Sequence, residues 1–222
     1  GGPDKTGILM LHRHLDRVLD VFPDMRFIHF LRDPRDVARS SIGMGWAGTV
    51  YHGIEHWMET EGDWNRLADR IPSGQVLRIS YEDLILDAEA QLREICTFCG
   101  VGFDPAMLEY DQDSTYEKPD PSLIFQWKSK QTRREIELVE TRIGPLLAAS
   151  GYQTGKRGPS PPGRWEKPGL APRKQRTTWA KRIERYGLRD PLIVAICNRF
   201  GGSSLSAKAQ RRIDEKTQAF LK

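Results

Sequence analysis

The sequence of 222 residues lacks the features that mark membrane, disulfide-rich and secreted proteins. No apolar run approaches the roughly 18 residues that a transmembrane helix needs. Three cysteines are too few for a disulfide framework, and the opening residues GGPDKTG contain neither an initiator methionine nor a signal peptide. We therefore expect no transmembrane segment and a cytoplasmic, reducing setting, and the opening residues suggest a fragment or a processed chain.

Two of the cysteines, Cys96 and Cys99, have the CxxC spacing that some metal and redox sites use. In LREICTFCGV, however, they recur with Leu92 and Ile95 at helical spacing. Cysteine packs as a small apolar side chain in protein cores. We interpret the pair as structural and expect no metal there.

Acidic residues are scarce in the last third of the chain. Residues 151–222 contain 17 Lys and Arg against 5 Asp and Glu, a net charge of +12, whereas residues 1–150 have a net charge of −8. Such asymmetry concerns partners and solubility rather than fold. Contact with a polyanion or a membrane surface and simple solvation are the alternatives for this basic end, and nucleic-acid binding is a third.

Two segments read as strands. MRFIHFLRD, residues 25–33, shows little alternation, as expected of a strand buried on both faces of a parallel sheet, and QVLRISY, residues 75–81, is the second strand. Helical patterns lie between and after them, which predicts an α/β fold with a parallel sheet flanked by helices. Because two strands make a small sheet, we expect further strands upstream of this sequence.

Start and stop signals define the expected helices. An amphipathic helix is predicted over 8–22, Asp33–Pro34 begins a second helix, and Asp87 and Gly100 bound a third. Thr132–Glu135 is a capping box. Residues 1–152 would form the α/β domain, 153–176 a basic Pro/Gly-rich linker, and 177–222 a basic helical extension whose second helix is capped by Asp190 and Pro191.

The segment FIHFLRDPRDVARSS carries the strongest chemical signal. It places Arg32 at the carboxyl end of a strand, where open α/β sheets bind ligands, and Ser40 two turns into the following helix. The helix N-terminus would add free N–H groups. An arginine, a hydroxyl and a helix start suit a phosphate dianion; the alternative is that the charges of RDPRD pair with one another.

This unit resembles the 3′-phosphate-binding element of sulfotransferases that use 3′-phosphoadenosine 5′-phosphosulfate (PAPS). PDKTG, FPDMRFIHFLRDPRD and RISYEDLILDAEAQLREICTFCGVGFDPAML resemble successive segments of the family, and Trp127 and Gly151–Tyr152 stand where bacterial members often have the same residues. The resemblance covers residues 3–152. It implies a P-loop-NTPase-like fold, of which this chain holds a part, and transfer of a sulfuryl group from PAPS to a hydroxyl or amine.

The resemblance implies roles for individual residues. Arg32 and Ser40 would hold the 3′-phosphate, and Tyr81 would lie near the adenine unless it is a core aromatic. Lys5 matches a lysine near the sulfuryl group in heparan-type relatives, where a cation stabilises developing charge; the alternative is a solvated terminal residue. A small molecule or a glycan would be the acceptor, with phenol, lipid and peptide also open.

One expected element is missing from the sequence. No PKSGTT-like turn, the family's 5′-phosphosulfate loop, occurs here, so the full enzyme is expected to be longer and this chain would supply the 3′-phosphate-binding half. The alternative is a catalytically inactive nucleotide- or polyanion-binding module. A P-loop kinase relative would need a Walker loop, which is not visible.

The stretch HGIEH, residues 52–56, fits an H-x-x-E-H zinc signature. A catalytic zinc site needs a third protein ligand, and none stands out in the sequence. Because family members place acceptor-site residues near this point, His56 and Trp57 are candidates for substrate contact instead. No metal is expected.

Overall fold

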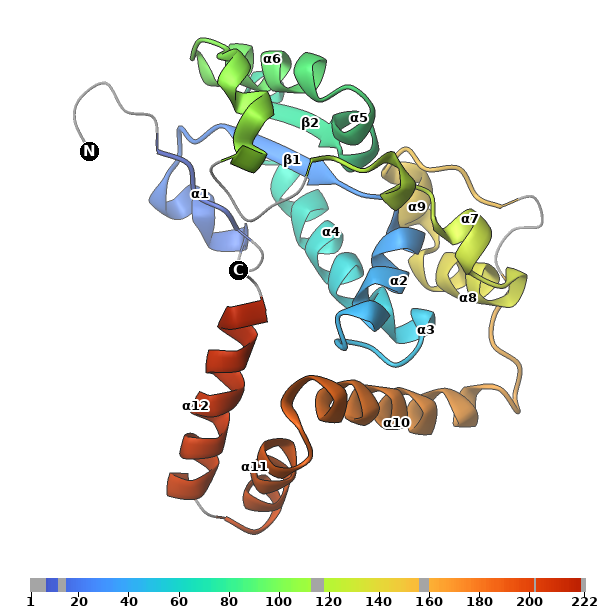
Figure 1. Cartoon of the computed structure of the whole chain (residues 1–222). Helices are drawn as coiled ribbons and strands as arrows, with labels where there is room; N and C mark the ends of the chain where they lie inside the picture. Colours follow the sequence, from blue (N-terminus) through green and yellow to red (C-terminus); the bar gives the residue numbers. More distant parts are fainter. Residues whose placement is uncertain (1–6, 12–14, 113–117, 156–159, 202, 221–222) are drawn as a thin grey trace.

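The computed structural model describes residues 7–11, 15–112, 118–155, 160–201 and 203–220. Two strands, β1 (Phe27–Leu31) and β2 (Val76–Ser80), pair in parallel, with Phe27 opposite Val76 and Leu31 opposite Ser80. The helices α5 (Tyr81–Leu86) and α6 (Ala88–Cys99) lie on one side of this sheet and α4 (Glu55–Ala68) on the other (Figure 1). The described part is therefore a mixed α/β structure with a small parallel sheet, as expected.

Burial along β1 differs from the sequence prediction. Phe27 and Leu31 are buried, whereas Ile28 and Phe30 are exposed. His29 lies on the same side as Phe27 and stacks on Trp64 of α4, with 4.2 Å between ring centroids. One face of β1 thus packs against α4 while the other is partly open, so the prediction of burial on both faces was wrong.

Several helix boundaries follow directly from local side-chain chemistry. Asp33 caps α2 (Pro34–Gly43) by accepting a hydrogen bond from the backbone N–H of Arg35, and Asp87 caps α6 in the same way. The capping box of Thr132 and Glu135 opens α8 (Arg133–Ile143). These three predicted starts are confirmed.

The remaining elements of the α/β part are short. They are η1 (Leu15–Arg17), α1 (Val18–Val21), α3 (Val50–Gly53), η2 (Ser73–Gln75), η3 (Pro105–Gln112), η4 (Pro121–Leu123), α7 (Trp127–Lys130) and α9 (Pro145–Ala149). The long helix predicted over 8–22 is reduced to η1 and α1, and residues 7–11 are not helical. Because Ile8, Leu9 and Met10 are exposed, their apolar pattern has no surface to pack against, and that prediction was wrong.

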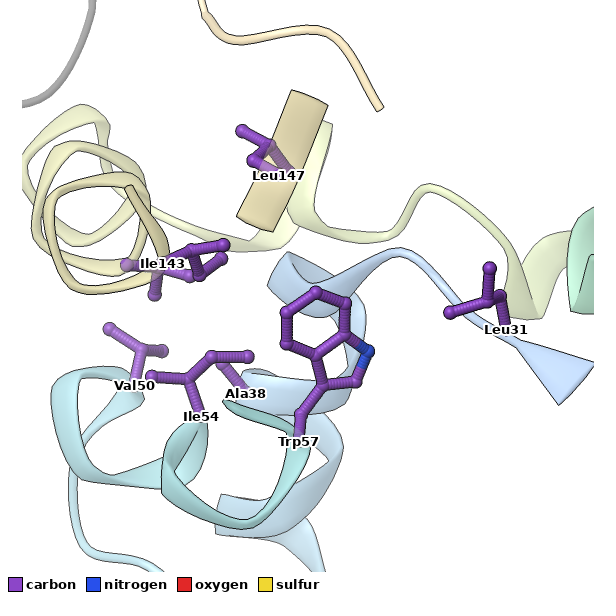
Figure 2. Packing of buried hydrophobic residues seen from close by; sticks show 8 residues of the cluster. Leu31, Ala38, Val50, Ile54, Trp57, Ile143 and Leu147 are labelled. Carbon is purple, nitrogen blue, oxygen red and sulfur yellow. The ribbon is translucent and has the colours of Figure 1, made fainter. Parts of the chain in front are cut away.

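The main core lies between α2, α3, α4, α8 and α9. Figure 2 shows Val50, Ile54 and Trp57 directed toward Ile143 and Leu147. Gly53 permits this close packing, because a Cβ at that position would collide with the carbonyl oxygen of Ala38 in α2. The core therefore fixes α2, and with it the segment that follows β1.

The basic end of the chain is helical over most of its described length. α10 (Lys167–Tyr186) is followed by α11 (Arg189–Phe200) and α12 (Ser203–Phe220), and α11 and α12 pack through Val194, Ala209 and Ile213. α10 begins inside the segment 153–176 that the sequence indicated as a loop, so much of that segment is helix. Asp190 does not cap α11 but pairs with Arg212 of α12 at 2.6 Å.

The helical extension contacts the α/β part near the end of α2. A cleft of about 400 Å³ lies there, and its lining includes Met44, Trp46, Lys181, Arg182 and Tyr186. Within the described residues, no helix is both long and apolar enough to cross a membrane.

Candidate functional site

The two strands end at the same edge of the sheet, and each is followed by a predicted donor-binding residue. Arg32 comes directly after β1, and Tyr81 comes directly after β2. The Arg32 guanidinium carbon lies 4.3 Å from the centre of the Tyr81 ring. The structure therefore brings these two candidates together at the carboxyl edge of the sheet, the edge where open α/β sheets bind ligands.

The hydrogen-bonding capacity of Arg32 is only partly used. Its Nη2 donates to the carbonyl oxygen of Leu123 at 3.0 Å, and its buried Nε has no hydrogen-bond partner among the described residues. A guanidinium carries five N–H donors. Tyr81 also meets Phe30, edge to face, with 6.2 Å between ring centroids. A cationic fork thus lies beside a small aromatic surface made by Phe30 and Tyr81.

Ser40 lies in α2 and its side chain is exposed. Its backbone carbonyl accepts a hydrogen bond from Met44, as in regular helix. The structure records no contact between Ser40 and Arg32, so a shared phosphate would have to span the surface between them. The predicted role of Ser40 stays a prediction.

The N-terminus of α2 is not the open anion site that the sequence suggested. The Asp33 carboxylate accepts the N–H of Arg35 at 2.9 Å, the Asp33 carbonyl accepts the N–H of Asp36 at 3.0 Å, and Pro34 has no N–H. Pro34, Arg35 and Asp36 are also buried. The expectation of free N–H groups here was wrong, because the capping carboxylate already occupies the place of an anion.

The second arginine of RDPRD forms a buried ion network. Arg35 donates to both carboxylate oxygens of Asp33, at 2.9 and 2.8 Å, and to Glu140 of α8 at 2.9 Å. Its guanidinium carbon also lies 3.7 Å from the centre of a Trp127 ring. Burial acts to lower the pKa of Arg35, but the hydrogen bonds and charges of Asp33 and Glu140 outweigh it and the pKa is raised. Arg35 is therefore a structural cation, as the alternative interpretation of RDPRD held.

Glu82 extends this network under the strand ends. It accepts a hydrogen bond from the backbone N–H of Asp33 at 2.9 Å and another from the Tyr152 hydroxyl at 2.9 Å. Burial first, and then the neighbouring charge of Glu82, raise the pKa of Tyr152, which stays protonated and donates. Glu82 thus ties the start of α2, the start of α5 and the segment after α9 to one point.

Asp36 holds the segment that contacts Arg32. It accepts the backbone N–H of Trp127 at 2.8 Å, while the indole N–H of Trp127 donates to Asp33 at 3.0 Å. Phe125, two residues before Trp127, has a φ of +53°, a strained conformation for a bulky residue. The acidic residues of RDPRD therefore fix the backbone that presents the Leu123 carbonyl to Arg32.

Sequence reasoning did not single out Arg35, Asp36, Glu82 or Glu140 as parts of the site. Their only signal was that each is a charged residue next to an expected element boundary or inside an expected helix. Their partners lie up to 105 residues away in the chain, as Arg35 and Glu140 show. Local patterns do not contain this information.

The predicted acceptor-side residues are not together. Trp57 is buried in the core cluster of Figure 2, packed among residues of α2, α3 and α8, whereas His56 next to it is exposed. The contacts of Trp57 are those of a core residue, so substrate contact would require it to leave the core. Lys5 lies outside the described residues, and its predicted catalytic role stays a prediction.

The HGIEH stretch has other contacts in the structure. His52 lies 2.8 Å from the Thr49 hydroxyl through its Nδ1, and Glu55 pairs with Arg142 of α8 at 3.0 Å. A helix break at Ile54, between α3 and α4, separates His52 from His56. The segment links α3 and α4 to α8.

Comparison with known protein families gives a match for the segment that contains this edge of the sheet. The model of the Sulfotransferase family matches residues 9–105, which include both strands, Arg32, Ser40 and Tyr81. Residues 9–105 belong to the sulfotransferase family. This agrees with the resemblance seen in the sequence, and the RDPRD unit lies within the matched part.

Two relatives and a solved structure are similar to a longer part of this chain. The omega-hydroxy-beta-dihydromenaquinone-9 sulfotransferases of Mycobacterium bovis and Mycobacterium tuberculosis are each 33% identical over 168 residues, 67% of this chain and 42% of theirs. The chain thus spans less than half the length of these relatives. A sulfotransferase domain from the curacin biosynthetic pathway, 18% identical, matches 64% of this chain and 58% of its own with a TM-score of 0.56, which supports the fold.

Proposed function

We propose that this chain binds the 3′-phosphoadenosine part of PAPS and serves a sulfotransferase that transfers a sulfuryl group to a hydroxyl or amine. The observation that carries the proposal is the Arg32 guanidinium held over Tyr81 at the carboxyl edge of the sheet. The family of residues 9–105 supports the reaction class. The named acceptor of the mycobacterial relatives is an omega-hydroxy compound, which supports a hydroxyl acceptor on a small molecule.

The residues present fit a phosphorylated nucleoside. Arg32 has N–H groups to spare, among them a buried Nε–H with no partner in the described part of the chain. A phosphate dianion would accept charge-assisted hydrogen bonds from this guanidinium. Because Asp33 closes the N-terminus of α2, side chains rather than helix N–H groups would hold the phosphate, with Ser40 as the hydroxyl donor. Tyr81 and Phe30 would offer an aromatic surface to the adenine.

In the reaction, the acceptor oxygen or nitrogen bonds to sulfur while the bond from sulfur to the bridging phosphate oxygen breaks. Adenosine 3′,5′-bisphosphate leaves, and the acceptor loses its proton. Of the predicted residues, Lys5 would stabilise the charge that develops on the bridging oxygen. Arg32 and Ser40 act at a distance from the sulfur, by holding the donor in place.

Calorimetric titration of adenosine 3′,5′-bisphosphate into this chain tests the proposal. We expect binding that Arg32→Ala weakens about 10- to 100-fold, the usual worth of hydrogen bonds to a charged group. Adenosine 5′-monophosphate lacks the 3′-phosphate, so it should bind the wild type more weakly than adenosine 3′,5′-bisphosphate does. Its affinity for Arg32→Ala should equal its affinity for the wild type.

Arg26 supplies a matched control at the other end of the same strand. Its Nη1 donates to the carbonyl of Phe98 at 2.6 Å, and its guanidinium carbon lies 5.9 Å from the Phe98 ring centre. Like Arg32, it therefore has a backbone carbonyl and an aromatic ring as neighbours. Arg26→Ala should leave binding unchanged. Equal losses in the two variants, or no discrimination between the two nucleotides by the folded wild type, would refute the assignment of the 3′-phosphate to Arg32.

The alternative is a nucleotide- or polyanion-binding module without catalysis. Binding of the phosphate through Arg32 and Ser40 is common to both functions, because neither residue would act at the sulfur. Selective binding of adenosine 3′,5′-bisphosphate together with sulfuryl transfer from PAPS to an alcohol would exclude this alternative. Selective binding alone would support it.

A further inference from the structure

The exposed side of α11 has an apolar stripe. Leu188, Leu192, Ile196 and Phe200 follow one another at intervals of four residues, and their side chains are 40–78% exposed. Residues four apart lie on one face of an α-helix. The stripe starts at the residue before α11 and runs along the whole helix.

This stripe lies opposite the face that holds α11 in place. Val194 and Asp190 are buried, the first in the small core with α12 and the second in its ion pair with Arg212. The apolar side chains of the stripe are therefore not needed for packing of the helical extension. Leu205, near the start of α12, is exposed as well and follows the stripe in the chain after the turn at Gly201.

Positive charge accompanies the stripe. Arg189 and Arg199, one at each end of α11, are exposed, and the Arg199 guanidinium carbon lies 5.9 Å from the centre of the Phe200 ring. The one acidic residue of α11, Asp190, is buried and neutralised by Arg212. The surrounding segment 151–222 has a net charge of +12.

We propose that α11 lies on the surface of a bilayer that contains anionic lipids, with the stripe in the acyl boundary and the arginines at the headgroups. An exposed apolar stripe with an arginine near each end can lie in the headgroup region of a bilayer, because long basic side chains extend toward the phosphates while the apolar side chains enter the acyl boundary. A second copy of this chain would bring the +12 segments of both copies together, which disfavours it as the occupant of the stripe. The exposed carboxylate-free face suits an anionic surface.

Vesicle sedimentation with the full chain tests the proposal. Vesicles of phosphatidylcholine with about one third phosphatidylglycerol should bind the protein, and pure phosphatidylcholine vesicles should bind it weakly. The double variant Ile196→Ser/Phe200→Ser should lose about tenfold or more in affinity, since two large apolar contacts are removed. Arg189→Gln/Arg199→Gln should weaken binding to the anionic vesicles. It should also make the remaining binding less sensitive to high salt.

The matched control is Leu86→Ser/Val101→Ser, which removes two exposed apolar side chains from the α/β part. It should bind like the wild type, and circular dichroism of all variants checks that the helices persist. Three outcomes overturn the proposal: no binding of the wild type to anionic vesicles, equal losses in the control and the stripe variant, or sedimentation velocity showing a dimer that the stripe variant alone dissociates.

Discussion

The Arg35 guanidinium joins Glu140, 105 residues further along the chain, at a distance of 2.9 Å, while it also holds both oxygens of Asp33. All three side chains are buried. Removing one member of a buried ion network leaves the charges of the others buried without a partner. The resulting loss of folding free energy is larger than the net contribution of the intact network. This relationship ties α8 to the start of α2, and therefore to the position of Arg32.

Arg35→Ala is predicted to lower the free energy of unfolding by about 3–5 kcal/mol, because Asp33 and Glu140 would remain charged and buried. Urea unfolding followed by circular dichroism measures this. Arg93→Ala is the matched control: Arg93 pairs with Glu89 on the exposed side of α6, and such pairs contribute about 0.5 kcal/mol or less. Comparable losses in the two variants would mean that the network does not hold α8 to α2.

Asp36→Asn is predicted to gain stability relative to the wild type as the pH rises above about 4. Burial is the main cause that raises the pKa of Asp36 above its ordinary value of 3.8, despite the hydrogen bond from Trp127. A raised folded-state pKa means that the folded protein binds the proton more tightly than the unfolded chain. The cost of ionising Asp36 is therefore absent below 3.8 and grows as the pH rises toward the raised pKa.

Urea midpoints of the wild type and Asp36→Asn, measured from below pH 3 to pH 7, would show this difference. Asp120 provides the opposite case, because hydrogen bonds from Ser122 lower its pKa. Asp120→Asn should therefore lose stability relative to the wild type as the pH rises through the lowered pKa toward 3.8. At neutral pH the variant should remain less stable than the wild type. If Asp36→Asn follows the same trend as Asp120→Asn, the burial of Asp36 is not the dominant influence.

Gly53→Ala is predicted to destabilise the protein by about 1–3 kcal/mol, the usual cost of overpacking a core. The new methyl group would collide with the backbone oxygen of Ala38, which a rotamer change cannot relieve. Gly74→Ala is the control, since an added Cβ there meets nothing within 4 Å. Thermal unfolding of both variants would decide; an unchanged midpoint for Gly53→Ala would contradict the close packing of α3 on α2.

The sequence contained the features of this fold that depend on neighbours in the chain. Asp33 as cap, the Thr132–Glu135 box and the two strands were predicted because capping and strand composition act over a few residues. The open side of β1 and the non-helical residues 7–11 were not, because burial depends on which elements reach a surface. The same holds for the site. Arg32 was predicted from its place at the end of a strand and Tyr81 from a resemblance, whereas the link from Arg35 to Glu140 joins distant segments.

Tyr81→Phe is predicted to retain the affinity for adenosine 3′,5′-bisphosphate, whereas Tyr81→Leu should weaken it about three- to tenfold. The ring, rather than the hydroxyl, lies against the Arg32 guanidinium, and contacts between an arginine and an aromatic ring contribute about 0.5–1 kcal/mol at exposed sites. Loss of stacking on adenine would add to this. Phe98→Leu, which removes the ring beside Arg26, should have no effect on binding. If Tyr81→Phe loses as much affinity for adenosine 3′,5′-bisphosphate as Tyr81→Leu does, the hydroxyl and not the ring contributes to binding. The aromatic surface beside Arg32 would then not be the adenine contact.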